Sequence, residues 1–194
     1  MATGPKQDMI RGAARLLSER GLQGTSFAEV LELTGAPRGS IYHHFPGGKA
    51  ELVRAALELL GQRVADGLAA GAASTPVEVI DAFVEGWRRV LVGSKFRAGC
   101  AVAAVAVGAG VDATDLLPNA AAAFEKWHVA LAAALVRTGM SGAAADELTT
   151  IVIVAMEGAL IVGRAAQDER AFSTVADHLH ALGVAARPRS VKKR

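Results

Sequence analysis

The sequence has few of the features on which most enzymes and extracellular proteins depend. Its 194 residues include a single cysteine, Cys100, so a framework of intramolecular disulfides is excluded. No Ser/His/Asp set, nucleotide-binding loop or cluster of metal ligands has a recognisable spacing. We therefore expect a protein that is not an enzyme, has no catalytic residues and holds neither a metal nor a cofactor.

Long apolar runs are also missing. The most apolar window, Ala98–Val111, has 14 residues, whereas a membrane-spanning helix needs about 20. The N-terminus opens Met-Ala-Thr-Gly-Pro-Lys and lacks the charged and apolar regions of a secretory signal. We expect no membrane association and a location in the reducing cytoplasm.

The alternation of apolar and polar residues that marks strands is scarce, and helix-forming residues are abundant. The chain is 52% hydrophobic, enough for a sizeable core. Apolar residues recur at intervals of three and four through most of its length, which is the period of a helix. The sequence predicts an all-α protein.

Charge is distributed unevenly along the chain. Residues 1–50 carry a net charge of +2, residues 51–186 carry −5, and the last eight, RPRSVKKR, carry +5. We therefore expect three parts: a first domain over 1–50, a larger domain over 51–186, and a disordered basic tail over 187–194. The tail either adds nonspecific attraction to a polyanion or is a solvated end without a role.

Three short helices are predicted in the first domain. The first ends at Gly21, and the second begins at Ser26, which forms a capping box with Glu29 three residues later. Pro37 stands at the start of a third helix that ends near Phe45, where Pro-Gly-Gly follows. Two short helices joined by a tight glycine-containing turn form a helix-turn-helix.

Further helices are expected in the larger domain. The predicted helices run from Lys49 to about Leu68, from Pro76 to the Gly93–Gly99 loop, over 98–109, through Phe124 to before Gly139, over Ser141–Arg164, and over 170–182. The helix at 98–109 is so apolar that we expect it to be buried on every side. Residues 112–119 are expected to form a turn.

Several separately spaced elements of the first domain resemble the N-terminal domain of the TetR family of transcriptional regulators. They are Ser26-x-x-Glu-Val, Gly35, Arg38-Gly-Ser-Ile-Tyr-x-His-Phe45 and Lys49-x-x-Leu52. The window from Arg97 to Ala106, together with His43-His-Phe-Pro-Gly-Gly-Lys49, is similar to the LmrA/YxaF-like branch. The resemblance implies a ligand-responsive DNA-binding regulator, most often a repressor that an apolar small molecule releases from a palindromic operator.

The third helix has the residue types that read DNA. Arg38 can donate two hydrogen bonds to a guanine, and Gly39 permits close approach of the helix to the groove. The polar side chains near them can bind DNA phosphates. The predicted DNA-binding residues are Thr25, Ser26, Arg38, Gly39, Ser40, Tyr42, His43 and Lys49, with Thr25, Ser26 and Lys49 gripping phosphates at helix N-termini. A metal at His43-His44 is disfavoured, because adjacent helical positions point about 100° apart. We expect His44 and Phe45 to pack inward.

Two interpretations stay open for the aromatic and sulfur-containing residues of the larger domain. They either line an apolar effector cavity between helices or form plain core; these residues are Phe83, Trp87, Phe96, Cys100, Phe124, Trp127, His128 and Met156. The family resemblance favours the cavity. It also implies a homodimer through helices near 143–164 and 170–182, with double-stranded DNA as the partner.

One alternative function remains at this stage. The chain would be a small-molecule binding or sequestering protein with a vestigial DNA-binding head. Repression and activation both stay open for the DNA-binding regulator.

Overall fold

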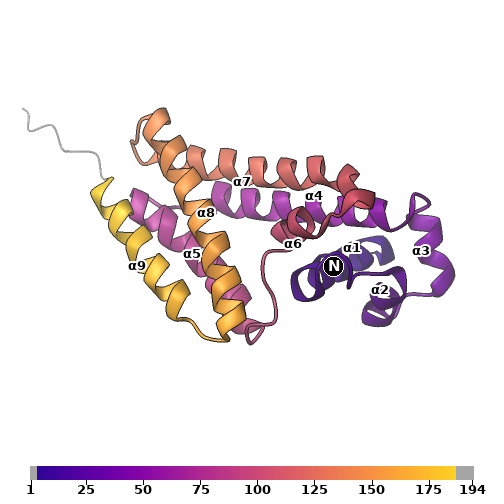
Figure 1. The fold of residues 1–194 in the computed structure, drawn as a ribbon. Coiled ribbons are helices and arrows are strands. Elements are labelled where there is room, and N and C mark those ends of the chain that lie inside the picture. The colour runs from indigo at the N-terminus through magenta and orange to yellow at the C-terminus, as the bar shows by residue number, and fades with distance from the viewer. Residues whose placement is uncertain (1–3, 187–194) are drawn as a thin grey trace, which may run out of the picture. The chain divides into compact units, whose positions relative to one another are not determined.

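The computed structural model describes residues 4–186, with the backbone alone at residues 111 and 112. All regular secondary structure in this range is helical, which confirms the predicted all-α class (Figure 1). The elements are α1 (Pro5–Arg20), α2 (Phe27–Thr34), α3 (Arg38–His44), α4 (Gly48–Ala70), α5 (Pro76–Gly93), α6 (Ala101–Gly108), the 3-10 helix η1 (Val111–Leu116), α7 (Leu117–Arg137), α8 (Gly142–Ala166) and α9 (Arg170–Ala185). The predicted basic tail at 187–194 lies outside the described residues.

The chain divides into two compact units. The first combines Met1–Val64 with Ala98–Lys126, and the second combines Ala65–Arg97 with Trp127–Arg194. Two of the three boundaries between the units fall within helices α4 and α7, so each of these helices continues from one unit into the other, and the third boundary lies between α5 and α6.

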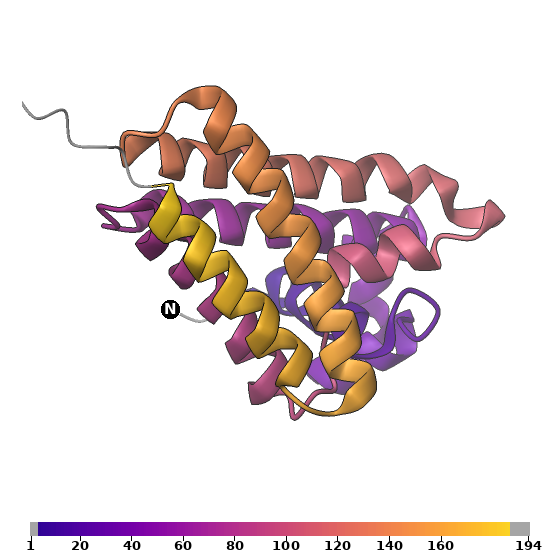
Figure 2. The same cartoon turned by 60° about the vertical axis from the view of Figure 1, so that its left-hand side comes forward.

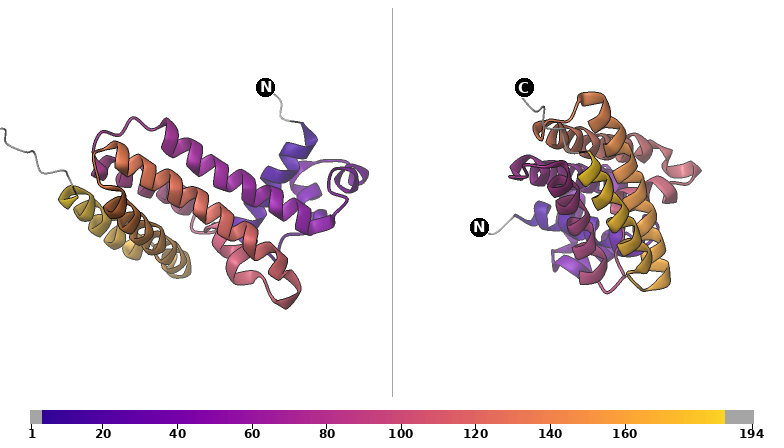
Figure 3. Two further views of the ribbon diagram at one scale, coloured as in Figure 1. Left: turned by 90° about the horizontal axis from the view of Figure 1, so that it is seen from above. Right: turned by 90° about the vertical axis from the view of Figure 1, so that its left-hand side faces the viewer.

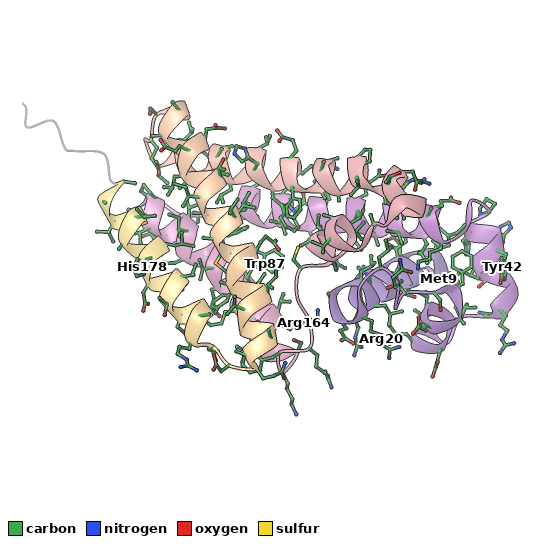
Figure 4. The ribbon with its side chains drawn as sticks, in the orientation of Figure 1. Met9, Arg20, Tyr42, Trp87, Arg164 and His178 are labelled. Carbon is green, nitrogen blue, oxygen red and sulfur yellow. The ribbon has the colours of Figure 1, made fainter. Side chains whose placement is uncertain are left out.

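The first unit is built around the three N-terminal helices and the first part of α4. Their apolar faces meet in a core that includes Met9, Leu17, Ile41, Phe45 and Leu52, each no more than 1% exposed. Met9 lies among these helices in Figure 4. The apolar residues whose spacing predicted α1 thus form one side of this core.

Helix α6 and the first part of α7 complete the first unit. Helix α6 packs on α1, and the Gly99 amide just before it donates to the Ser18 carbonyl at 2.9 Å. Gly61 of α4 lies against α7, since a Cβ added there would be 3.3 Å from the Ala123 Cα. Figure 3 shows these two helices running side by side.

The second unit is formed mainly by α5, α8 and α9, which pack against one another (Figure 2). Two glycines permit close crossings. A Cβ at Gly183 of α9 would lie 2.7 Å from the Val77 Cα of α5, and a Cβ at Gly163 of α8 would lie 3.0 Å from Leu91 Cδ2. His180 Nδ1 of α9 also lies 3.0 Å from the Asp81 carboxylate of α5.

Helices α8 and α9 carry large apolar side chains that this chain leaves uncovered. On α8, Val154 is 67% exposed and Ile161 is 60% exposed. Ile151 and Val162 on α8 and Leu182 and Val184 on α9 are exposed as well. By length and composition alone α8 could span a membrane, but a core helix of a soluble protein meets the same criteria.

Two predictions about 98–119 are wrong. Helix α6 is not buried on every side: Val102 and Val105 are fully buried, but Val107 is 84% exposed, since α6 uses only one side to pack in its unit. Residues 112–119 are not a simple turn, because η1 ends at Leu116 and α7 follows from Leu117. Apolar composition does not reveal which side of a helix finds a neighbour.

Candidate nucleic-acid interface

The turn between α2 and α3 is set by local hydrogen bonds. Helix α2 ends at Gly35, whose φ of 68° is left-handed and whose amide donates to the Leu31 carbonyl at 2.9 Å. Pro37 is the N-cap of α3, one residue before its first turn, with an extended ψ of 137°. Glycine supplies the left-handed conformation at no steric cost, so the two helices meet at a fixed turn.

Ser26 caps the N-terminus of α2, as predicted, but the predicted capping box is not completed, because Glu29 bonds the hydroxyl of Ser26 and not its backbone amide. Ser26 Oγ accepts from the Glu29 amide at 3.3 Å and donates to Glu29 Oε2 at 3.0 Å. Arg20 of α1 donates to the other carboxylate oxygen at 2.8 Å. The hydrogen bond from Ser26, with that from Arg20, holds the pKa of Glu29 below its usual value of 4.5, against a smaller opposing effect of burial.

Replacing Ser26 with alanine is expected to lower the free energy of unfolding by about 1 kcal/mol at neutral pH, as loss of an N-cap usually does. Because the Glu29 pKa is lowered on folding, its contribution is present above the unfolded value near 4.5 and is lost as pH falls through the folded value. Thermal unfolding from pH 7 to pH 3 should therefore show the effect of Ser26→Ala shrinking.

Ser141→Ala is the matched control for this prediction. Ser141 caps α8 by accepting from the Ala144 amide at 3.3 Å, and no carboxylate stands at that third position. Its loss should cost a similar free energy at every pH in the range. An equal pH dependence in both variants would contradict the role of Glu29.

Helix α3 turns its apolar residues inward and its polar residues outward. Ile41 and Phe45 are at most 1% exposed, which confirms the inward packing of Phe45, while His44 is half-buried. Arg38, Gly39, Tyr42 and His43 are exposed, and Arg38 makes no hydrogen bond or ion pair within the described part of the chain. The predicted reading residues therefore share one open surface.

The ring of Tyr42 packs against α2, although the side chain is 66% exposed. Its ring meets the Phe27 ring of α2 edge to face, with 5.5 Å between centroids and 77° between planes. Figure 4 shows Tyr42 on α3 at the edge of the first unit. The contact fixes the ring and leaves the hydroxyl free for a partner in solution.

Gly39 serves no packing purpose in the free protein, because a Cβ added there would meet nothing within 4 Å. Gly39→Ala should therefore leave the melting temperature unchanged or slightly raised, since alanine favours helix. With α3 in the major groove, as the sequence predicts, the added methyl group should still weaken specific DNA binding about tenfold by keeping the helix from the groove. Calorimetry and a binding titration measure the two effects.

Gly12→Ala is the opposite case and serves as the control. A Cβ at Gly12 would lie 2.8 Å from Thr34 Cγ2, and Thr34 is held because its hydroxyl donates to the Val30 carbonyl at 2.7 Å. Overpacking here is expected to cost about 1–3 kcal/mol. A stability loss at Gly39 equal to that at Gly12 would contradict the interpretation of Gly39 as a surface position.

The remaining predicted contacts are engaged inside the protein. Thr25 is 1% exposed, and its hydroxyl donates to the Gly21 carbonyl at 2.9 Å. Ser40 Oγ donates to the Pro37 carbonyl at 2.7 Å. Lys49 is half-buried, and its Nζ donates to the Leu22 carbonyl at 2.6 Å.

Two supporting residues were missed in the sequence. Phe27 packs under Tyr42, and Glu51 Oε2 accepts from the Gly47 amide at 2.8 Å at the start of α4. The second had a usable signal, because an acidic residue in the first turn of a helix commonly satisfies a free amide. The first had none, since Phe27 and Tyr42 lie on different helices.

Both halves of the chain match known families. Residues 9–56 match the family described as bacterial regulatory proteins, tetR family. Residues 76–178, more than half of the chain, match the C-terminal domain of LmrA/YxaF-like transcriptional regulators. The chain belongs to the TetR family. It is a DNA-binding transcriptional regulator of the LmrA/YxaF-like branch.

Relatives of this TetR-family regulator cover most of its length. An uncharacterized HTH-type transcriptional regulator of Mycobacterium tuberculosis is 37% identical over 85% of this chain and 87% of its own. The HTH-type transcriptional regulator LmrA of Bacillus subtilis is 30% identical over 84% of this chain and 88% of its own.

Solved structures share the fold of the regulator at low identity. A TetR regulator from Legionella pneumophila has a TM-score of 0.79 at 19% identity, and it covers 93% of this chain and 98% of its own. The regulatory protein TetR from Rhodobacter sphaeroides has a TM-score of 0.76 at 22% identity, over 90% and 96% of the two chains. At these identities the likeness shows the fold alone.

The residues predicted to line an effector cavity are divided between the two units of the regulator. Trp87 of α5 contacts Phe83 and Trp127 edge to face, with centroids 6.3 Å and 5.5 Å apart (Figure 4). Phe96, His128 and Met156 belong to the same unit, whereas Cys100 and Phe124 belong to the other. The structure shows the ring contacts among Phe83, Trp87 and Trp127, and the cavity itself stays a prediction.

The two polar residues of that set have partners. Cys100 is the N-cap of α6, where its Sγ accepts from the Ala103 amide at 3.3 Å. His128 Nε2 lies 3.1 Å from Thr150 Oγ1 and 3.6 Å from Asp146 Oδ1. Both side chains thus contribute to the ends and contacts of helices.

Proposed function

We propose that the regulator is a cytoplasmic homodimeric repressor that reads a palindromic operator with α3 of each subunit. The observation that carries this proposal is the division of α3, whose buried face is fixed by Ile41 and Phe45 while Arg38, Tyr42 and His43 remain exposed. Two such helices reach successive major grooves when they are about 34–36 Å apart.

Each exposed residue of α3 has a separate role in this proposal. Arg38 reads a guanine through its O6 and N7 atoms, and Gly39 allows close approach. Tyr42 and His43 contact the sugar–phosphate backbone, which fixes the register without reading sequence. Ser40 is half-buried, and it adds a further contact when its hydroxyl leaves the Pro37 carbonyl. Thr25 and Ser26 hold the start of α2 and thereby support α3.

The dimer forms through α8 and α9 in this proposal, as predicted for helices near 143–164 and 170–182. The exposed apolar residues of these helices support it, since a chain that leaves Val154 and Ile161 uncovered gains free energy when a second copy buries them. A two-fold interface uses the same surface on both subunits, so each of these residues is buried once in each subunit.

Residues 51–186 form the effector-binding and dimerisation domain in this proposal, with residues 1–50 as the DNA-binding head. The effector is a small apolar molecule that binds near the aromatic cluster of Phe83, Trp87 and Trp127. It releases DNA to the extent that it binds the DNA-free conformation more tightly than the DNA-bound one.

Selection from random duplex DNA tests the proposal. Bound fragments are recovered over several rounds, and the enriched duplex is titrated at two salt concentrations. An enriched two-fold sequence with tight, salt-sensitive binding is expected. No enrichment, with weak binding that vanishes at moderate salt, would instead identify a small-molecule binding protein with a vestigial head.

A further inference from the structure

The turn between α5 and α6 is held in a conformation that residues other than glycine rarely adopt. Lys95 and Phe96 follow one another with φ angles of 53° and 60°, and the Phe96 amide donates to the Leu91 carbonyl at 2.8 Å. In this left-handed region the Cβ of each residue is crowded by the backbone. Such a conformation persists only where the surrounding structure determines it.

The turn between α8 and α9 has the same kind of strain. Gln167 is the C-cap of α8, with a φ of 56° and a ψ of 31°. In the part of the chain that the structure describes, Lys95, Phe96 and Gln167 are the only residues other than glycine with a positive φ. Figure 1 and Figure 2 show the end of α5 and the turn between α8 and α9 side by side. The strained residues of the chain are therefore gathered at one place in the second unit.

Side-chain contacts join the two turns to one another. Gln167 Nε2 donates to the Phe96 carbonyl at 3.3 Å and to the Arg164 carbonyl at 2.6 Å. Arg88 of α5 forms an ion pair with Glu169, the N-cap of α9. The bond from Gln167 thus ties the strained turn after α5 to the turn between α8 and α9, beside an ion pair that ties the same two regions.

Residues 96–99, which we call the strap, connect this turn to the DNA-binding head. The Gly99 amide donates to the Ser18 carbonyl of α1 at 2.9 Å. Only Arg97 and Ala98 lie between Phe96, which is tied to Gln167, and Gly99, which is tied to α1. So short a stretch of chain has little slack, so a displacement of Phe96 is passed on to Gly99 and α1.

We propose that Gln167 is a positioning residue for DNA binding, which couples the turn between α8 and α9 to the head through the strap. When the bond from Gln167 to the Phe96 carbonyl breaks, Lys95 and Phe96 can relax to more favourable backbone conformations, and the strap shifts. The inference rests on the proposed function, in which α8 and α9 form the dimer. A change in the arrangement of these helices would thereby alter the position of α1.

Hydrogen exchange in the DNA-free protein tests the coupling without an operator. Gln167→Gly removes the side-chain bonds and supplies the residue that a left-handed C-cap favours, so the melting temperature should be unchanged or slightly raised. The Gly99 amide, followed by NMR, should nevertheless exchange about fivefold faster than in the wild type, the effect expected from the loss of one hydrogen bond. Gln167→Lys is the matched rescue, because its ammonium group can donate to the same two carbonyls, and it should exchange at the wild-type rate.

Operator binding separates coupling from a purely structural effect on the turn. Gln167→Gly should weaken binding to the selected operator about fivefold and leave binding to random duplex unchanged. Insertion of two glycines between Arg97 and Ala98 slackens the strap and should weaken operator binding to a similar extent. In the chain with this insertion, Gln167→Gly should have no further effect, because residues that act through one another are not additive.

Gln167→Lys keeps the proposal testable even if the chain with the insertion folds poorly, since it should bind the operator as the wild type does. Equal exchange of the Gly99 amide in the wild type and Gln167→Gly would overturn the proposal. A fivefold effect of Gln167→Gly that persists beside the insertion, or weak operator binding by Gln167→Lys, would overturn it as well. Absence of operator preference in the wild type would instead contradict the proposed function, and the exchange rates would still decide the coupling.

Discussion

Arg38→Ala is expected to lower affinity for the selected operator by about 30-fold to about 20,000-fold. A bidentate arginine–guanine pair contributes about 1–3 kcal/mol of discrimination, and a dimer would lose two such pairs. Binding to random duplex should change little, because base contacts carry the specificity. Titration on both duplexes measures the ratio.

The structure makes Arg38→Ala a clean test. Arg38 is exposed and makes no hydrogen bond or ion pair within residues 4–186, so its loss should not alter the melting temperature. Arg63, exposed on α4 of the same unit, provides a matched loss of one positive charge. Equal losses on operator and random duplex in Arg38→Ala would contradict base reading.

The second large effect concerns the dimer. Ile161→Glu should give a folded monomer whose operator affinity is about 10²–10⁴-fold lower than that of the wild type. Ile161 is 60% exposed on α8, so a charge there costs little in the isolated chain. In a two-fold interface one added carboxylate from each subunit would be buried, which disfavours the dimer. The DNA-binding head of a monomer would also lose the high effective concentration that the partner's head provides in the dimer.

Val129→Glu is the matched control for Ile161→Glu. Val129 lies on α7 and is 57% exposed, close to the exposure of Ile161, but it is not on the proposed dimer helices. Analytical ultracentrifugation should show a dimer for Val129→Glu and a monomer for Ile161→Glu, with the helical circular dichroism of both unchanged. A dimeric Ile161→Glu would move the proposed interface away from α8.

Local signals predicted much of the fold. Ser26 and Ser141 begin helices because a side-chain oxygen satisfies an amide three residues later. Gly21 and Gly35 end helices because their φ angles of 73° and 68° are left-handed. Each of these features depends on residues that are neighbours in the sequence, so the amino-acid order alone reveals them.

Features that depend on distant residues were not predictable. The bond between Lys49 and Leu22 and the ring contact between Phe27 and Tyr42 join separate helices. The exposure of Val107 depends on which side of α6 finds a neighbour. The spacing of apolar residues in the sequence indicates that a helix has an apolar face, but tertiary packing determines which part of that face is buried.

The measurement that tests the central claim most directly is binding to the selected operator after base pairs are inserted at its centre. The claim is that two α3 helices of one dimer read two half-sites on the same side of the duplex. Inserting about five base pairs rotates one half-site to the opposite side, since B-DNA has about 10 base pairs per turn. The account predicts that specific binding falls to the level of one half-site. Unchanged affinity after this insertion would contradict reading by a two-fold dimer.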